Sequence, residues 1–141
     1  MPPNRPPLGL QLATSARTVG RAFNDALAAA GGSIPIWLVL ATLRGEEWRT
    51  QHELARAIGI EGPTLTRHLD GMERAGLVVR RRAPGDRRAI QVELTERGEE
   101  LHGELLTAVI AFNKRLRRGL SETDLDQLTR MLTRLAENAG S

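Results

Sequence analysis

The sequence predicts a mostly α-helical fold with one small β-hairpin. Over most of the 141 residues, apolar side chains recur at steps of three and four, which is the period of helices that pack on one face. Residues 77–94 depart from this pattern, because they form two strand-like runs around a Pro-Gly-Asp turn, as a hairpin does. With 40% hydrophobic and 26% charged residues, the chain has the composition of a globular protein large enough to bury a core.

The composition also excludes several classes of site. The chain contains no cysteine, which excludes disulfides, thiolate zinc sites and thiol-based redox switches. We expect no metal and no cofactor, because His52, His68 and His102 lie far apart along the chain. No apolar run reaches the ~18 residues of a membrane span, and the first residues lack the apolar core of a signal peptide. We therefore expect a cytoplasmic protein.

The first part of the chain is predicted to form an arm and two helices. Residues 1–7 include four prolines, which predicts a flexible or extended arm. Residues 8–32 contain a helix that two glycines end. Ser33 is the expected N-cap of a second helix over residues 34–43, which is apolar nearly all round and is predicted to be buried. The apolar stripe of the first helix consists of Leu12, Ala16, Val19, Phe23 and Leu27.

Two short helices follow with helix-turn-helix spacing. Thr50 and the glutamate three residues later predict a capping box, and Gly59 ends the helix that this box begins. Gly62 and Pro63 begin the next helix, which is expected to run to about Ala75. A short turn that contains glycine is typical of a helix-turn-helix.

A hairpin is predicted directly after these helices. Residues 77–82 and 90–94 form its strands, and residues 83–89 form its turn. The second strand is expected to be half-buried, with its apolar and polar side chains on opposite faces. Its apolar side chains are Ile90, Val92 and Leu94, which alternate with Gln91 and Glu93.

Two more helices complete the prediction. Thr95 is the expected cap of a long helix with the stripe Leu101, Leu105, Val109, Phe112 and Leu116. Ser121 and Asp124 begin a last helix that carries a leucine seam near heptad spacing. Such a seam favours packing on the first helix, on a partner chain, or on both; an ordinary intramolecular core is the alternative.

The positive charge is concentrated in one segment. The chain has 20 basic and 17 acidic residues, and residues 67–88 contain seven arginines against three carboxylates. The planar guanidinium of arginine matches phosphate oxygens and stays charged at any working pH. This concentration predicts a surface that binds an anionic partner such as nucleic acid.

The second short helix of the pair carries the best candidates for base contacts. Leu65, Leu69 and Met72 define its inner face, and Arg67 points away from them. A recognition helix contacts base edges through residues near its N-terminal end, which favours Thr64 and Arg67. A solvated face with an Asp70–Arg74 ion pair is the alternative.

The hairpin supplies a second candidate contact. Arg87 and Arg88 at its tip are expected to enter a minor groove, whose negative potential attracts arginine when the groove is narrow. The arginines at 80–82 are expected to meet phosphates. The predicted DNA contacts are Pro63, Thr64, Arg67, His68, Arg80, Arg82, Arg87 and Arg88, with Asp86 as a support for the wing.

Three stretches together resemble a known family. They are residues 57–78, which hold the helix-turn-helix, the Asp86-Arg87-Arg88 turn, and the Leu-Thr-x-x-Gly pattern at 94–98. They resemble the MarR family of bacterial transcription regulators, and its SlyA branch in particular. The resemblance covers residues 50–98 well, whereas the outer helices match in length, order and apolar pattern only.

The resemblance implies a winged helix-turn-helix, at residues 33–95, flanked by dimerisation regions at 8–32 and 96–141 after the arm at 1–7. It implies a homodimer that binds a pseudopalindromic operator in the bacterial nucleoid and usually represses transcription. In that arrangement Pro63, Thr64 and Arg67 contact the major groove, Arg88 contacts the minor groove, and Asp86 holds the wing. The expected dimer contacts are Leu12, Val19, Leu125, Leu128, Leu132 and Leu135.

Many members of this family respond to small phenolic or aromatic anions in a cleft beside the dimerisation helices. Such a pocket would be lined here by Phe23, Ile36 and Trp37, with Arg17 or His52 as polar partners. The alternative is that Trp37 is an ordinary core residue.

Other functions have less support in the sequence. No phosphate-binding glycine loop and no nucleophile motif occurs in the sequence, so we expect no enzyme. The remaining alternatives are a winged-helix module that binds an acidic protein and an architectural protein that binds DNA without sequence preference. Salt dependence and sequence preference on DNA separate these alternatives from a regulator.

Overall fold

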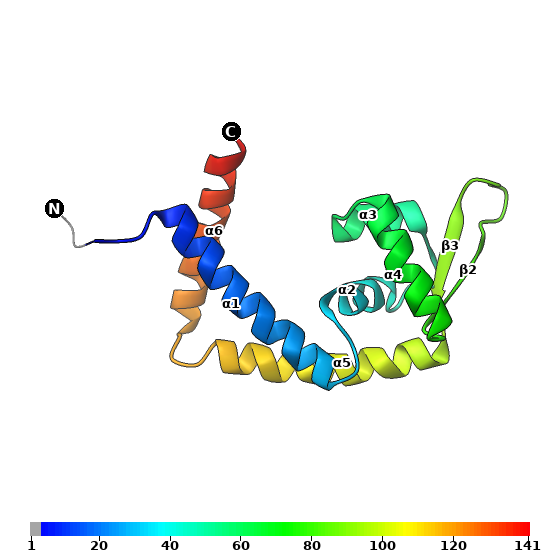
Figure 1. Cartoon of the computed structure of the whole chain (residues 1–141), viewed down its shortest axis with the longest axis horizontal. Coiled ribbons are helices and arrows are strands. Elements are labelled where there is room, and N and C mark those ends of the chain that lie inside the picture. The colour runs from blue at the N-terminus through cyan, green and yellow to red at the C-terminus, as the bar shows by residue number, and fades with distance from the viewer. Residues whose placement is uncertain (1–3) are drawn as a thin grey trace. The chain divides into compact units, whose positions relative to one another are not determined.

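The computed structural model describes residues 4–141, so residues 1–3 of the predicted arm lie outside the described part. Within that part, six helices and three short strands follow one another along the chain (Figure 1). The chain divides into two compact units, the first up to Val109 and the second from Ile110 to Ser141. The elements are α1 (Leu8–Ala29), α2 (Ile34–Leu43), β1 (Arg49–Thr50), α3 (Gln51–Ile58), α4 (Gly62–Arg74), β2 (Val78–Arg82), β3 (Ile90–Leu94), α5 (Glu96–Leu116) and α6 (Glu122–Gly140).

The predicted helix boundaries before the helix-turn-helix are confirmed. Gly31 adopts a φ of 95°, and the N–H of Gly32 donates to the carbonyl of Leu27 at 2.9 Å, which closes the C-terminus of α1. The hydroxyl of Ser33 accepts from the N–H of Ile36 at 3.3 Å. This bond satisfies one of the N–H groups that a helix leaves free at its start.

The helix-turn-helix is confirmed, with one difference at its first cap. The hydroxyl of Thr50 accepts from the N–H of Glu53 at 3.1 Å, and Gly59 ends α3 in the left-handed conformation. In a complete capping box the carboxylate of Glu53 would accept from the backbone N–H of Thr50. Here it accepts instead from the hydroxyl of Thr50, at 2.9 Å. Thr50 is also a residue of β1 and pairs with Gln91 of β3, so its backbone lies against the sheet.

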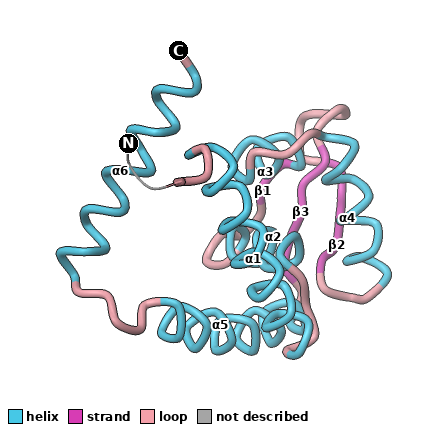
Figure 2. The backbone as a smooth tube through the Cα atoms, turned by 60° about the vertical axis from the view of Figure 1, so that its left-hand side comes forward, coloured by secondary structure: helices cyan, strands magenta, loops and turns pink. Residues whose placement is uncertain are grey.

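The hairpin is confirmed as part of a three-stranded antiparallel sheet in the order β1-β3-β2 (Figure 2). Its register runs from the Val78–Leu94 pair to the Arg82–Ile90 pair. The predicted alternation of burial along β3 is wrong. Ile90 is 40% exposed, whereas Gln91 is 7% exposed. Ile90 lies beyond the last residue of β3 that pairs with β1, so β1 does not cover it.

A single apolar cluster holds the first unit together. Leu27 of α1 and Leu40 of α2 join the cluster that contains the inner face of α4. The predicted inner face of α4 is confirmed, because Leu65, Leu69 and Met72 are all buried. Burying each side chain of this size contributes about 1.5–3 kcal/mol. The core therefore fixes which face of α4 remains outside.

The start of α5 is joined to the end of α4. The hydroxyl of Thr95 accepts from the N–H of Gly98 at 3.0 Å and donates to the carbonyl of Gly76 at 2.5 Å. The N–H of Thr95 donates to the carbonyl of Leu77 at 3.1 Å. A Cβ atom at Gly98 would overlap that same carbonyl oxygen of Leu77. The Leu-Thr-x-x-Gly pattern therefore has a steric reason.

We expect Gly98→Ala to lower the free energy of unfolding by about 2–3 kcal/mol, the upper range for overpacking, because a backbone carbonyl cannot move aside as a side chain can. Gly103→Ala is the matched control on the same helix, where a Cβ atom meets nothing within 4 Å. That control should gain about 0.5–1 kcal/mol from helix propensity. Urea denaturation measures both, and equal effects of the two variants would contradict the steric reason.

The second unit leaves apolar side chains exposed. The predicted start of α6 at Ser121 and Asp124 is confirmed and has the form of a capping box, but α6 buries none of its residues. Leu116, the last residue of the predicted stripe of α5, is 46% exposed. In the seam, Leu128 and Leu132 are 43% and 41% exposed.

Among residues 4–141, no single helix is both long and apolar enough to cross a membrane. Only α1 and α2 taken together pass that test, by length and composition, and they are bent by 71°. Three residues of α2 are buried in the protein core, which accounts for its apolar composition.

Candidate nucleic-acid interface

The N-terminal half of α4 forms an exposed surface. Glu61 caps the helix without a side-chain hydrogen bond, and Pro63 lies in its first turn. Pro63 and Arg67 are exposed, and Thr64 and His68 are half-buried. All four are predicted DNA contacts, the first three of them in the major groove, and they lie together along one stretch of α4. An exposed helix N-terminus also offers free N–H groups to an anion.

A side-chain contact between α3 and α4 orients this surface. The amide of Gln51 donates to the hydroxyl of Thr66 at 2.8 Å, and that hydroxyl donates to the carbonyl of Gly62 at 3.0 Å. The hydroxyl of Thr66 is therefore committed to the protein. The hydroxyl of Thr64, nearer the helix start, is therefore a better candidate for a DNA contact than that of Thr66.

Arg80 differs from its predicted role as a phosphate contact. Its Nη2 atom donates to the carboxylate of Asp70 at 2.6 Å and to that of Glu73 at 3.0 Å. Its backbone N–H also donates to Glu73, at 3.2 Å, and its side chain is only 18% exposed. The predicted alternative partner of Asp70 was Arg74, but Asp70 pairs with Arg80. The guanidinium of Arg80 thus links β2 to α4.

These contacts also shift the ionisation of the cluster. Hydrogen bonding to Arg80 lowers the pKa of Glu73, against the smaller opposing effects of desolvation and of the charge on Asp70. The same hydrogen bond raises the pKa of Arg80, with a further contribution from Asp70. Glu73 and Arg80 therefore remain charged at neutral pH.

The other hairpin arginines divide into two groups. Arg81 lies 3.5 Å from the carboxylate of Glu93, on the strand face opposite to Arg80. Within the part of the chain that the structure describes, Arg82, Arg87 and Arg88 form no ion pair within 4.0 Å, and all three are exposed. Their charges are therefore available to an external anion.

The hairpin tip is held by its own backbone. The carboxylate of Asp86 accepts from the backbone N–H of Arg88 at 2.9 Å, and Gly85 adopts a φ of 77°. The N–H of Ala83 donates to the carbonyl of Ala89 at 2.9 Å and closes the turn. Asp86 thus supports the turn through a main-chain bond, so the guanidinium of Arg88 is not held by it.

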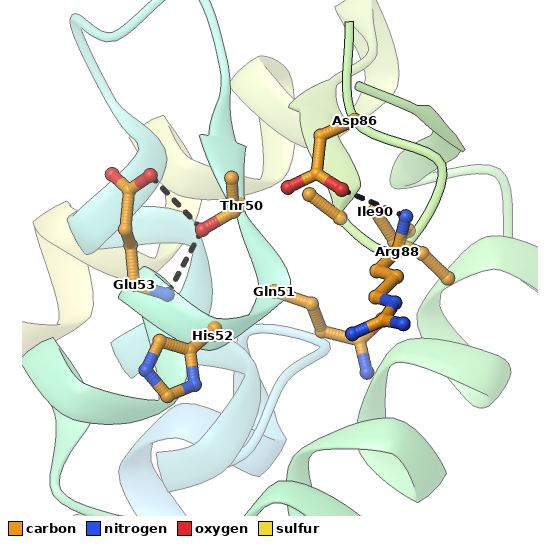
Figure 3. A pocket seen from close by; sticks show the side chains of 8 residues that line it. Thr50, Gln51, His52, Glu53, Asp86, Arg88 and Ile90 are labelled. Carbon is orange, nitrogen blue, oxygen red and sulfur yellow. Dashed lines mark hydrogen bonds between the residues drawn. The ribbon is translucent and has the colours of Figure 1, made fainter. Parts of the chain in front are cut away.

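An open hollow of about 490 Å³ lies between the tip and the start of α3. Figure 3 shows Asp86, Arg88 and Ile90 on the hairpin side, with Thr50, Gln51, His52 and Glu53 on the other. The structure thus places His52 of α3, a predicted ligand partner, across this hollow from the hairpin. None of the other four predicted ligand residues lines this hollow.

The other four predicted ligand residues lie on α1 and α2. Phe23, Ile36 and Trp37 pack against the core cluster, and Arg17 is exposed on α1. Trp37 stacks on His102 of α5, with ring centroids 5.3 Å apart and planes 19° apart. The sequence analysis considered His102 only in excluding a metal site. Its spacing from Leu105 and Val109 of the apolar stripe, three and seven residues later, is the signal that could have indicated burial.

His102 is buried in its neutral form. It is 6% exposed, and Nη1 of Arg44 lies 3.1 Å from its Nδ1 atom. Because a guanidinium can only donate, Nδ1 must be the acceptor and cannot carry a proton. Burial lowers the pKa of His102, the charge of Arg44 lowers it further, and Glu99 acts in the opposite direction.

We expect the free energy of unfolding to fall as the pH drops below about 6.5, the ordinary histidine pKa. Because the pKa of His102 is lowered in the folded state, the stability that neutral His102 contributes is fully present above the unfolded-state pKa. It is lost as the pH falls toward the folded-state pKa. His102→Phe keeps a ring against Trp37 but cannot be protonated, so its stability should fall less between about pH 7 and pH 5.

Urea denaturation at each pH measures this difference. His52→Gln is the control, because His52 is exposed. The free energy of unfolding of this variant should depend on pH as that of the wild type does. A wild-type pH dependence in the His102→Phe variant would show that His102 is not the titrating group.

Comparisons with known proteins identify similar transcriptional regulators, three of which were solved with DNA. Residues 35–89 match the model of the MarR family. The chain is similar to the transcriptional repressor CouR, solved bound to a 23-mer DNA duplex, at 30% identity over 92% of each chain and a TM-score of 0.84. It is similar to a mutant of MarR from E. coli complexed with operator DNA, at 25% identity over 92% of this chain and 93% of that one (TM-score 0.83). It is also similar to the M. tuberculosis transcriptional regulator MosR in complex with DNA, at 27% identity over 96% of this chain and 97% of that one (TM-score 0.78).

Proposed function

The chain belongs to the MarR family of transcriptional regulators, and on that premise we propose that it binds a specific operator on double-stranded DNA. It is a regulator and not an enzyme. The observation that carries the proposal is the arrangement of two exposed surfaces. The N-terminal half of α4 presents Thr64 and Arg67, and the hairpin beside it presents the unpaired Arg82, Arg87 and Arg88.

The two surfaces suit two neighbouring grooves. The exposed face of α4 would enter a major groove, which is wide enough for an α-helix and in which arginine bonds guanine O6 and N7 with both fork nitrogens. The hairpin tip, with Arg87 and Arg88, would enter the adjacent minor groove, whose negative potential attracts arginine. Arg82 and His68 would then contact the backbone. That similar proteins have been solved in complex with DNA supports DNA binding itself.

We further propose that the protein acts as a homodimer on a pseudopalindrome. The exposed leucines of α6, with Leu12 and Val19 of α1 at 40% and 37% exposure, are the surface proposed for the partner. Two recognition helices would read half-sites about 10 base pairs apart, centre to centre. A dimer bound to a promoter in the bacterial cytoplasm, at the nucleoid, would block polymerase, so repression is the proposed outcome.

Release by a small aromatic anion is a separate part of the proposal. Trp37 is the residue to monitor, because it lies between the core and His102 and a ligand beside it would change its fluorescence. Titration with a panel of aromatic carboxylates should quench that fluorescence and lower operator affinity together. A panel that changes neither would count against an effector of this class.

The test of DNA binding is fluorescence anisotropy on the duplex upstream of the protein's own gene, on a shuffled duplex, and across a salt series. We expect tight binding to the native duplex and a steep fall in affinity with salt, because phosphate contacts release counterions. Equal binding to both duplexes would favour an architectural role or a target elsewhere. No binding to either duplex at low salt would contradict the proposal and favour a module that binds an acidic protein.

A further inference from the structure

Resting on the proposed function, we propose that Arg80 is a positioning residue that locks the wing to the recognition helix and thereby sets operator specificity. The sequence suggested a phosphate contact, as for any arginine in a basic hairpin. The contacts of Arg80 indicate a different role. It makes three hydrogen bonds to α4, two from Nη2 and one from its backbone N–H.

The geometry of these bonds restricts the hairpin in two ways. β2 is an edge strand, paired with β3 alone, so the N–H of Arg80 has no strand partner on its outer side. The carboxylate of Glu73 accepts from that N–H at 3.2 Å and from Nη2 at 3.0 Å, and therefore binds both main chain and side chain. Asp70, one helical turn earlier, accepts from Nη2 at 2.6 Å. Two points on α4 thus hold one point on β2.

The charge balance of the cluster also argues against a phosphate contact. One guanidinium lies between two carboxylates, so the cluster carries a net negative charge. A phosphate that approached Arg80 would meet Asp70 and Glu73, whose side chains are 47% and 42% exposed, before the side chain of Arg80, which is 18% exposed. Arg82 lies two residues along the same strand face, is exposed, and has no such partner.

The consequence concerns the relation between two DNA contacts. Arg67 lies on α4 upstream of Asp70, and Arg88 lies at the tip of the hairpin whose stem contains Arg80. A fixed stem holds the tip at one position relative to the recognition helix. Only operators whose minor groove lies at that position receive both contacts. Without the lock, either contact forms alone, so specificity falls while non-specific affinity persists.

The test uses the double variant Glu73→Gln with Arg80→Gln, which removes the lock and leaves the net charge of the cluster unchanged. We expect operator affinity to fall at least about tenfold, with affinity for a shuffled duplex within about twofold of the wild type. The slope of log affinity against log salt should stay the same. Arg82→Gln is the control, and two lost phosphate contacts per dimer should reduce that slope by about 1.8.

A second measurement tests the positioning directly. Arg88→Ala should weaken operator binding less in the double variant than in the wild-type background, because an unlocked tip no longer makes its contact in register. Arg80→Lys, which keeps the charge and loses the fork, should fall between the wild type and the double variant. Thermal unfolding shows whether each variant is folded. If the double variant is not folded, operator binding is compared between Arg80→Lys and the wild type alone.

Two results would overturn the inference. One is a smaller salt slope with equal losses on operator and shuffled duplex, which would make Arg80 a phosphate contact. The other is unchanged operator affinity in the folded double variant. A wild-type protein that does not prefer its operator would instead contradict the proposed function, and the two failures are therefore distinguishable.

Discussion

Replacing Leu128 and Leu132 together by glutamate is expected to convert a dimer into a monomer and to weaken operator binding more than about 100-fold. Both leucines are more than two-fifths exposed within the chain. Burial of each would contribute about 1.5–3 kcal/mol, and a twofold interface contains each position twice. The substitutions remove that burial and place charges in the contact. Sedimentation equilibrium gives the oligomeric state, and anisotropy gives the affinity.

Arg130→Gln is the control for this variant. It makes the chain more negative by one charge, as a single leucine-to-glutamate change does, and it lies on the opposite face of α6 from the seam. The control should remain a dimer. A glutamate variant that still sediments as a dimer would show that the leucine seam packs within one chain, which the sequence alone left as an alternative.

Arg67→Ala is expected to weaken operator binding by about 10- to 100-fold per half-site and to relax the preference at one base position. An arginine that bonds both acceptors of a guanine contributes ~1–3 kcal/mol of discrimination. Affinity for a shuffled duplex should change little. Selection of bound sequences from a random pool, followed by anisotropy on the selected duplexes, measures both effects.

Arg74→Ala is the matched control, since Arg74 is exposed on the same outer half of α4 but at its C-terminal end. Residues at that end point away from the bases when a recognition helix enters a groove with its N-terminal residues. The control should keep the wild-type base preference. An equal loss for Arg67→Ala on operator and shuffled duplexes would make Arg67 a phosphate contact instead.

Most elements of the fold were predictable because local chemistry and packing agree there. Ser33, Thr50 and Ser121 each cap the helix that their spacing predicted. Gly31 and Gly59 end helices with positive φ angles, which glycine adopts at little cost. The inner face of α4 followed from helical periodicity alone, because its apolar residues occur every three or four positions.

Features that depend on contacts between distant residues were not predictable. β1 has only two residues and exists because Arg49 and Thr50 pair with β3, about 40 positions later. The burial of Gln91 depends on its place in the central strand of the sheet. Neither the short run at 49–50 nor the polar side chain at 91 carries a local signal for these outcomes.

The candidate site shows the same division. Composition and spacing identified the arginine-rich segment and its two surfaces, because charge density is a property of the sequence. Which arginines are available depends on where the carboxylates lie, and Asp70 and Glu73 reach Arg80 only after the hairpin folds back on α4. The stacking of His102 on Trp37 likewise joins residues 65 positions apart.

The hairpin tip has a consequence for how such proteins diverge. Its carboxylate–main-chain bond and its closing backbone bond lie within residues 83–89, whereas the stem is tied to α4 through Arg80. Substitutions at exposed positions away from such contacts usually change stability by less than about 0.5 kcal/mol. Mutations at positions 84, 87 and 88 can therefore accumulate without loss of fold. Under this division, the residues proposed to reach the minor groove can change while the bonds that hold the stem stay in place.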